Sequence, residues 1–388
     1  MSADEGRWIR RGEALGRLGV KAQTLYAYVS RGRIAARPDP DDPRRSLYAA
    51  RDIARLAGAP DAGDPEPRPA ARSSAGRGEA EIWSSVSVIA GERLFYRGLD
   101  AVQLAETATL EDAARVLWSA RLDNPFALTR PRIGATPGGS ARARLFAALA
   151  RRADEDAETP DRSPAALRLE CARVLDEAVD AVAGPGPRLF LHQRLARAWK
   201  IPERDGPLLR RALVLAADPG FDPAIVAARA AASGGAAPAA AALAGLSTLA
   251  ASAEVTGMAR ASAWIIAVRR QAFDAARRAA EAGSLEGFGD PAWPAGDPRA
   301  AALLAAADLP PDLARAVREG ELAAGRPPAF SLALAVTARR LELPREGAAD
   351  ILMIGRLAGL LAHVLDQMID GSPIRARLRY VGPEPGAH

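Results

Sequence analysis

A loop rich in glycine and proline, residues 287–298, limits most strongly what this chain can fold into. It reads Gly-Phe-Gly-Asp-Pro-Ala-Trp-Pro-Ala-Gly-Asp-Pro, with five Gly and Pro residues ahead of Asp297. This composition excludes a regular helix or strand and predicts a rigid, irregular loop. Asp297 followed by Pro298 is typical of a helix start, so Arg299 is expected in the first turn of the next helix. A guanidinium beside backbone that can approach a ligand closely is typical of a carboxylate-binding site.

The composition predicts a helical body around this loop. Apolar residues make up 49% of the 388 residues and aromatic residues only 5%, with Ala, Leu and Arg the commonest types. Runs of β-branched residues are short, so the fold class is expected to be all-α. We predict helices over residues 110–120, 164–181, 189–200, 208–217, 224–233 and 239–253. Ser163 and Asp222, each followed by proline, are expected to be N-caps, and a small hairpin is expected around Gly91.

A basic module precedes this body. Residues 1–60 carry twelve Lys and Arg against seven Asp and Glu, whereas the rest of the chain is neutral. Helices are expected over 13–18 and 22–30, followed by a hairpin of 34–37 with 46–48 and a helical turn at 52–56. The sequence Leu-Gly-Val at 18–20, followed by Thr-Leu-Tyr at 24–26, resembles winged helix-turn-helix modules of the excisionase or mercury-regulator type. This resemblance assigns residues 1–58 to such a domain.

The helix-turn-helix resemblance implies DNA as a partner. The residues it places at the groove or on phosphates are Gln23, Thr24, Tyr28, Arg31, Arg33, Arg44 and Arg45. The residues leave a second interpretation open, a small helical module that serves packing or dimer contacts. Residues 59–80, rich in Ala, Gly, Pro and Ser, are predicted to be a flexible linker.

Several classes of protein are disfavoured by the sequence. Cys171 is the single cysteine, which excludes an intramolecular disulfide and fits a reducing cytoplasm. No CxxC, HExxH or histidine cluster occurs, so no metal site is expected. The first twenty residues are charged throughout, unlike a signal peptide, and the Ala-rich stretch 236–253 is too weakly hydrophobic for a membrane span. We expect a cytoplasmic protein with no membrane partner and no covalently bound cofactor.

Two runs of the body match a known family in order and spacing. One is Leu-Phe-Tyr-Arg-Gly-Leu-Asp at 94–100, and the other is the loop from 287 to 300. The second is similar to Gly-Phe-Gly-His-Pro-x-Tyr-Pro-x-Gly-Asp-Pro-Arg-Ala of the citrate synthase family, and the resemblance runs from about residue 84 to 383. It implies the citrate synthase fold, with a large domain of residues 81–253 and 356–388 and a small domain of residues 254–355. It also implies condensation of acetyl-CoA, as co-substrate, with oxaloacetate.

The resemblance places three arginines at substrate-binding positions. Arg299 matches the arginine of Asp-Pro-Arg-Ala, and Arg356 opens a run that ends in His363, with Leu360 in place of the family's Trp. Arg375 matches the first arginine of a terminal Arg-Pro-Arg. In the family such arginines clamp the substrate carboxylates, because a planar guanidinium matches a carboxylate bidentately. The alternative is that all three form surface or interface salt bridges.

The family's catalytic positions are all substituted. Asp290 stands for the histidine of the loop, Glu254 for the histidine that stabilises the enol, and Ser331 for the aspartate that removes the methyl proton. Pro219 replaces the histidine that binds oxaloacetate, and the residues after Glu254 are Val and Thr in place of paired glycines at which acetyl-CoA approaches the backbone. Loss of all these groups is expected to leave almost no condensation activity.

Three functions remain open. The first is a citrate synthase-like pseudoenzyme that retains a carboxylate-binding arginine pocket and forms a homodimer, or a heterodimer in which it is the non-catalytic subunit of an active citrate synthase paralogue. The second is a metabolite-sensing DNA-binding regulator. The third is an acyl-CoA acyltransferase with an altered mechanism or substrate, so whether the chain is an enzyme is itself open.

Overall fold

The structure, a computed structural model, describes residues 8–18, 22–30, 34–39, 42–50, 52–53, 82–130, 136–156, 162–184, 186–271, 275–283, 285–370, 373–374 and 381. The chain divides into two compact units, residues 1–80 and 81–388. Each unit is described by itself. The predicted linker, residues 59–80, lies outside the described residues.

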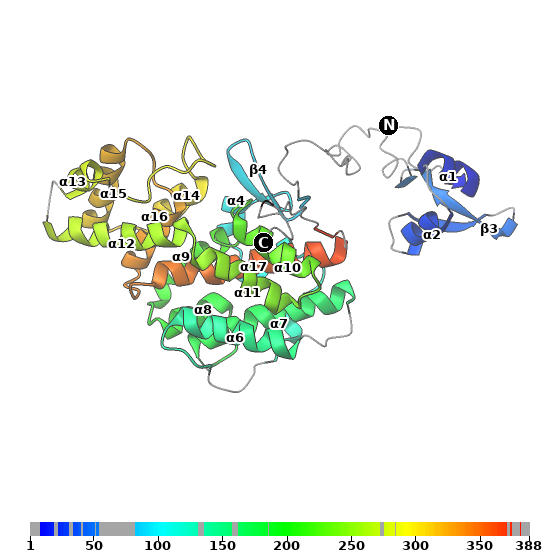
Figure 1. Cartoon of the computed structure of the whole chain (residues 1–388), viewed down its shortest axis with the longest axis horizontal. Coiled ribbons are helices and arrows are strands. Elements are labelled where there is room, and N and C mark those ends of the chain that lie inside the picture. Colours follow the sequence, from blue (N-terminus) through cyan, green and yellow to red (C-terminus); the bar gives the residue numbers. More distant parts are fainter. Residues whose placement is uncertain are drawn as a thin grey trace, which may run out of the picture. The chain divides into compact units, whose positions relative to one another are not determined.

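The first unit combines a three-stranded antiparallel sheet with two helices (Figure 1). Its elements are β1 (Trp8–Arg10), α1 (Arg11–Leu18), α2 (Ala22–Ser30), β2 (Ala36–Asp39) and β3 (Asp42–Ala49). β3 is the central strand, with Ala36 of β2 opposite Tyr48. The two predicted helices and the predicted hairpin are present, whereas the pairing of β1 with β3 was not predicted. The core of this unit is small and includes Ile9, Leu25, Ile34, Tyr48 and Ile53.

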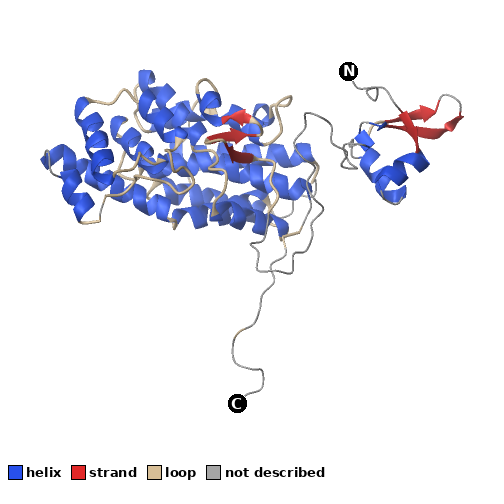
Figure 2. Ribbon diagram, turned by 90° about the horizontal axis from the view of Figure 1, so that it is seen from above, coloured by secondary structure: helices blue, strands red, loops and turns tan. Residues whose placement is uncertain are grey.

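The second unit is almost entirely helical, as predicted (Figure 2). Its first half contains β4 (Ser87–Ala90), β5 (Arg93–Tyr96), β6 (Leu99–Asp100), α4 (Ala101–Ala105), α5 (Leu110–Leu117), the 3-10 turn η1 (Pro125–Leu128), α6 (Ala141–Glu155), α7 (Pro164–Ala183) and α8 (Leu191–Ala198). The second half contains the 3-10 turn η2 (Glu203–Asp205), α9 (Gly206–Leu215), α10 (Pro223–Ser233), α11 (Pro238–Ala250), α12 (Ala253–Gln271), α13 (Ala275–Glu281), α14 (Pro298–Ala306), α15 (Pro311–Ala324), α16 (Phe330–Arg340) and α17 (Gly347–Asp370).

Local sequence signals set several of these boundaries. The side chain of Ser163 accepts a hydrogen bond from the N–H of Ala166 at the start of α7, and Asp222 accepts one from Ile225 at the start of α10. Both caps are followed by proline in the first helical position, where its missing N–H costs nothing. The predicted hairpin is also present, because β4 pairs with β5 across a turn in which Gly91 and Glu92 have positive φ.

α17 is the central helix of the second unit. It packs against α9, α10, α11 and α16, and its residues 351–365 are buried. Close approach is possible at Gly359, where a Cβ would lie 2.0 Å from the carbonyl oxygen of Ala217. α17 is long and apolar enough to cross a membrane, yet 94% of its most apolar window is buried inside the unit, as expected of a core helix. The bent pair α11 and α12 passes the same test of length and composition.

The helices of the second unit gather into two groups in the view of Figure 1. α12 to α16 lie on one side, while α6, α7, α8, α10 and α11 lie on the other side. α12, α14 and α16 pack against one another through α16, and α13 packs against α15. The predicted division into a large and a small domain, at residues 254 and 355, remains a prediction.

Candidate functional site

The predicted glycine-rich loop is fixed against the start of α16. The N–H of Gly289 donates to the carbonyl of Pro327, and the N–H of Ala329 donates to the carbonyl of Gly287, both at 2.8 Å. Gly287 has a φ of +92°, and a Cβ there would lie 2.8 Å from the Cβ of Leu332. Glycine is therefore required at 287 by its left-handed backbone and by the close approach of α16.

Asp290 stabilises a turn within this loop. One of its carboxylate oxygens accepts a hydrogen bond from the N–H of Ala292 at 2.9 Å, and its carbonyl accepts one from Trp293 at 2.9 Å. An aspartate that accepts from the N–H two residues further on forms an Asx turn. The contacts of Asp290 among the described residues are thus those of a turn-forming residue.

Arg299 is buried at the start of α14 and is already paired. Its Nε and Nη2 atoms donate to the carboxylate of Asp297, with the shortest contact at 2.7 Å, and its guanidinium lies 4.5 Å from the ring centroid of Phe330. Burial acts to lower the pKa of Arg299, but the charge and hydrogen bonds of Asp297, together with Tyr96 and Glu254, outweigh it and the pKa is raised. Nη1 is buried and has no hydrogen-bond partner among the described residues.

Arg356, in α17, is fully buried between two carboxylates. Its Nη1 pairs with Asp222, the N-cap of α10, and its Nε donates to the carbonyl of Ala216 at 3.4 Å. Its Nη2 lies 3.7 Å from Oε2 of Glu254 and makes no hydrogen bond within the described part of the chain. Glu254 lies in the first turn of α12, where the helix dipole favours an acidic side chain.

Arg299 and Arg356 both interact electrostatically with the hydroxyl of Tyr96. Burial and the charge of Asp218 raise the pKa of the Tyr96 hydroxyl, whereas Arg299 and Arg356 both act to lower it. The charge of Glu254 also helps to raise the pKa of Arg299. The structure therefore brings together two of the three predicted arginines and one of the three substituted catalytic positions. Arg375 lies outside the described residues.

The remaining substituted positions carry side chains of a different kind. Ser331 is half-buried in the first turn of α16 and follows Phe330, over which Arg299 lies. Val255 is buried in the first turn of α12, and the Thr256 hydroxyl donates to the carbonyl of Ser252 at 3.0 Å. Branched side chains thus stand at the start of α12 where the resemblance would place paired glycines.

A buried polar cluster adjoins the arginines and was not predicted. Nε2 of His363 lies 3.0 Å from Oδ2 of Asp218, and both side chains are almost fully buried. The hydroxyl of Ser87 donates to the other carboxylate oxygen. Burial alone would raise the pKa of Asp218, but the charge and hydrogen bond of His363 lower it. The Tyr96 hydroxyl lies 3.1 Å from the Asp218 carbonyl.

Two sequence signals pointed toward this cluster without identifying it. Tyr96 lies in the matched run 94–100, and His363 closes the run that Arg356 opens. The sequence placed each on a helix or strand, but it did not pair either with Asp218. Pro219, the next residue, is half-buried in the turn between α9 and α10.

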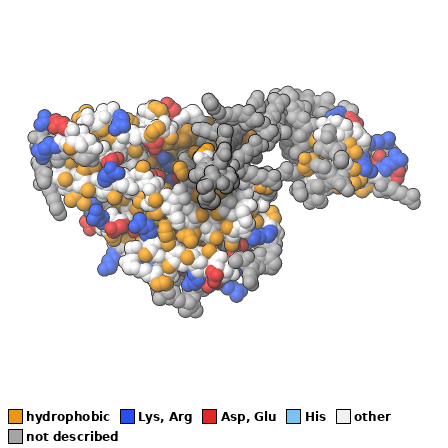
Figure 3. Space-filling model, viewed as in Figure 1, with side chains coloured by type: hydrophobic (Ala, Val, Ile, Leu, Met, Phe, Trp, Pro, Cys, Tyr) orange, Lys and Arg blue, Asp and Glu red, His pale blue; other side chains and the backbone are white. Residues whose placement is uncertain are grey.

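The predicted DNA-binding residues are only partly described. Tyr28 packs against the core of the first unit, whereas its neighbour Tyr26 is 49% exposed. Arg45 is exposed and lies 3.1 Å from Asp42. Figure 3 shows basic side chains on this unit, and Arg10 and Arg37 are further exposed members on the sheet. Arg31, Arg33 and the side chains of Gln23, Thr24 and Arg44 lie outside the described residues.

A metal site is not indicated within the described ranges. No group of three or more His, Cys, Asp or Glu side chains there is arranged so that it could hold a metal ion. The guanidinium groups of the arginine pair can bind anions, and Asp297, Asp222 and Glu254 are the anions already present.

Comparison with known proteins identifies the architecture. The family model of the citrate synthase C-terminal domain matches residues 138–377. No curated protein matches the chain. Among solved structures, citrate synthase from Thermotoga maritima is similar with a TM-score of 0.64 and 20% identity, covering 80% of this chain and 96% of that one.

Two further solved structures have the same fold. Citrate synthase from Thermoplasma acidophilum, solved as a ternary complex with carboxymethyl coenzyme A and oxaloacetate, has a TM-score of 0.64 and 18% identity, covering 79% of this chain and 95% of its own. Citrate synthase from Pyrobaculum aerophilum has a TM-score of 0.60 and 18% identity. The match covers 80% of this chain and 92% of that one. At these identities the similarity shows the shared fold.

Proposed function

The chain belongs to the citrate synthase family, and from this premise we propose that it binds a small carboxylate at Arg299 and Arg356 without catalysing the condensation of acetyl-CoA with oxaloacetate. In the citrate synthase family, a histidine stabilises the enol of acetyl-CoA by donating a hydrogen bond to it. In this chain that position is Glu254, whose carboxylate faces the guanidinium of Arg356. A carboxylate accepts hydrogen bonds and does not donate them, unlike the histidine that it replaces. This observation carries the proposal.

Two guanidinium nitrogens support retained binding of an anion. Nη1 of Arg299 and Nη2 of Arg356 are buried and without a hydrogen-bond partner in the described ranges, and a buried donor gains most from a charged acceptor. A di- or tricarboxylate that reached both would satisfy them. Glu254 would compete for Nη2 of Arg356, so the affinity of the pair for such a ligand is expected to be moderate.

Acetyl-CoA is not expected to be a good ligand of this chain. The family's co-substrate approaches backbone at paired glycines, and Val255 and Thr256 carry branched side chains there. The role that fits is a non-catalytic subunit, in a homodimer or in a heterodimer with an active citrate synthase. Size-exclusion chromatography with light scattering, on the chain alone and co-expressed with a candidate paralogue, tests this assembly.

The proposed loss of condensation activity is tested by incubating the purified protein with acetyl-CoA and oxaloacetate and measuring the release of free CoA thiol. We expect no release above the uncatalysed rate. Thiol release that Arg299→Ala abolishes would instead support the third function, an acyltransferase with altered residues. Isothermal titration with oxaloacetate and citrate tests binding separately, and absence of heat at millimolar ligand would contradict the carboxylate site.

The second candidate function is a DNA-binding regulator that senses a metabolite. It is favoured by the arrangement of the first unit, in which two helices are followed by an antiparallel hairpin that carries exposed Arg37 and Arg45. A mobility-shift assay on the upstream region of its own gene, at low and at physiological salt, tests it. Absence of binding at low salt would count against it, because phosphate contacts are strongest there.

A further inference from the structure

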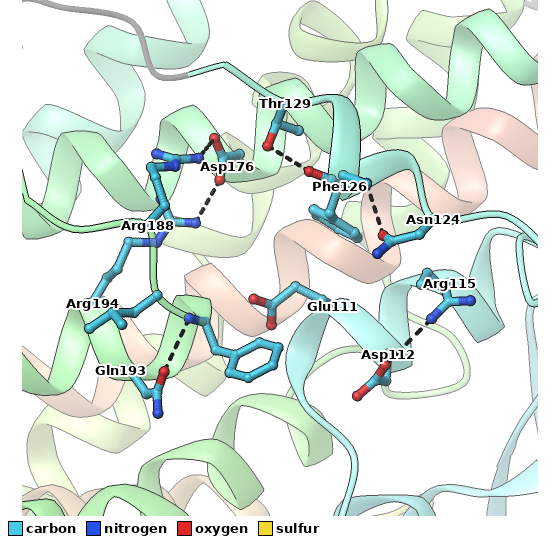
Figure 4. A pocket seen from close by; sticks show the side chains of 13 residues that line it. Glu111, Asp112, Arg115, Asn124, Phe126, Thr129, Asp176, Arg188, Gln193 and Arg194 are labelled. Carbon is cyan, nitrogen blue, oxygen red and sulfur yellow. Dashed lines mark hydrogen bonds and ion pairs between the residues drawn. The ribbon is translucent and has the colours of Figure 1, made fainter.

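A separate pocket lies on elements that do not carry the arginine pair. It has a volume of about 370 Å³ and is lined by residues of α5, η1, α7, α8 and the segment before α8 (Figure 4). Phe126, half-buried, and Phe190, 54% exposed, contribute aromatic surface. Figure 4 shows Glu111 in the middle of the lining residues, with its carboxylate directed into the space between them.

The arginines of this pocket are already neutralised. Arg188 and Arg194 each pair with both Asp176 and Asp180, so these four charges cancel. Both Arg194 contacts are short, at 2.6 Å, and join charged groups, so they are charge-assisted hydrogen bonds. An anionic ligand would therefore have to compete with two aspartates that are held in place.

The charges of a second ion pair at the pocket, Arg115 with Asp112, also cancel. Nη1 of Arg115 lies 3.7 Å from Oδ1 of Asp112. The other guanidinium nitrogens of Arg115 donate to the carbonyls of Ala120, Arg121 and Asp123. Asp180 does not line the pocket, but with it counted the four carboxylates exceed the three guanidinium groups by one. After these pairings Glu111 is the lining charge that no neighbouring cation in the described residues compensates by a salt bridge.

Only one of the two carboxylate oxygens of Glu111 accepts a hydrogen bond from the described residues. Oε1 accepts a hydrogen bond from the N–H of Leu191 at 2.8 Å and thereby caps α8. Oε2 is buried and has no hydrogen-bond partner among the described residues. Burial raises the pKa of Glu111, and the hydrogen bond from Leu191 and the charge of Arg194 offset this effect only in part.

We propose that this pocket binds a small ligand with a primary ammonium group and an apolar or aromatic body. The ammonium would donate to Oε2 of Glu111 and supply the missing counter-charge. The body would contact the rings of Phe126 and Phe190, which also attract a cation through their π faces. An amino acid and a simple amine share this chemistry. The site is independent of the carboxylate ligand proposed above, since it uses none of the same residues.

The experiment is isothermal titration of the full chain with four probes of similar shape. Benzylamine and L-phenylalanine carry the ammonium, benzyl alcohol is neutral, and phenylacetate is anionic. We expect benzylamine or L-phenylalanine to bind at least tenfold more tightly than benzyl alcohol and phenylacetate. If L-phenylalanine binds and benzylamine does not, the ligand is an amino acid; the reverse result identifies an amine. Absence of heat with both ammonium probes at millimolar concentration would overturn the proposal.

Glu111→Gln is the matched variant, because its amide oxygen can still accept from Leu191 and cap α8 while the charge is removed. We expect it to keep the melting temperature of the wild type and to lose at least tenfold in affinity for the ammonium probe. The control is Glu203→Gln, an exposed glutamate of η2 outside the pocket. Unchanged binding by folded Glu111→Gln would contradict the proposal, and the four-probe series on the wild type decides the charge preference even if this variant does not fold.

Discussion

The Nη2 atom of Arg356 lies 3.7 Å from the Oε2 atom of Glu254. This distance allows attraction between the charges but is too long for a hydrogen bond. Arg356 is fully buried, whereas the Glu254 side chain retains 31% of its exposure, so the carboxylate is the partner that can move toward solvent. We therefore expect the proposed ligand carboxylate to displace Glu254 from the guanidinium of Arg356.

The first prediction concerns this competition. Glu254→Gln removes the competing charge, and we expect the affinity for oxaloacetate or citrate to increase about tenfold, which corresponds to ~1.4 kcal/mol. Isothermal titration measures the change. Glu281→Gln, on the exposed end of α13, is the control and should leave the affinity unchanged. Weaker binding by Glu254→Gln would mean that Glu254 contacts the ligand instead of competing with it.

A second prediction concerns the loop that holds Arg299 in place. Gly287→Ala places a Cβ 2.8 Å from that of Leu332 on backbone with a φ of +92°, so we expect a loss of about 2 kcal/mol in the free energy of unfolding. Chemical denaturation measures it. Gly139→Ala is the control, because a Cβ there meets nothing within 4 Å, and its effect should stay within about 0.5 kcal/mol. Equal effects of the two variants would show that the loop tolerates a side chain.

The sequence predicted those parts of the fold that local chemistry determines. Ser163 and Asp222 cap the helices that they were expected to cap, and the turn at Gly91 joins two paired strands. Caps and turns depend on a few neighbouring residues, so composition and spacing are sufficient for them. The first strand of the N-terminal unit was not predicted, because three residues give no periodicity and β1 is defined by its pairing with β3.

The candidate site could be predicted only as a set of positions. Motif matching identified Arg299, Arg356 and Glu254, and the structure brings all three to one place. Matching could not show that Asp222 would pair with Arg356, because these residues are 134 positions apart, one at the N-cap of α10 and the other within α17. The loop also illustrates a limit of local chemistry: the conformation of Gly287 is fixed by contact with α16, which no local pattern shows.

A third prediction concerns acid stability and rests on His192. Burial and, less strongly, the charge of Arg210 lower the pKa of His192 from 6.5 to about 4. Between these values the unfolded chain binds a proton that the folded chain does not, so the free energy of unfolding decreases as the pH falls. The slope should be less than about 1.4 kcal/mol per pH unit, because the group is partly solvated.

His192→Gln removes this contribution. We expect the variant to gain stability relative to the wild type as the pH is lowered from 6.5 to 4, whereas the difference between the two proteins should be constant above pH 7.5 or so. Denaturant unfolding at several pH values measures both curves. A difference that stays constant over the whole acid range would contradict the assignment of this pH dependence to His192.

The last prediction concerns the buried pair Asp218 and His363. Removing one partner of a buried hydrogen-bonded pair leaves the other polar group unsatisfied and typically costs about 1–3 kcal/mol, and more for a charged group. We therefore expect Asp218→Asn and His363→Gln each to destabilise the second unit by at least about 1–3 kcal/mol. The hydrogen bond from Ser87 and that from the N–H of Gly220 reach only Oδ1 of Asp218, so neither replaces His363, which contacts Oδ2.

A double-mutant cycle separates this coupling from simple loss of packing. Asn and Gln can still form one neutral hydrogen bond, so the double variant should be more stable than the sum of the two single losses predicts, by at least about 1 kcal/mol. The four proteins are compared by chemical denaturation at pH 7. Strictly additive losses of stability would mean that Asp218 and His363 act independently, Asp218 through Ser87 and His363 through Ser84. The 3.0 Å contact between Asp218 and His363 would then contribute little to the stability of the fold.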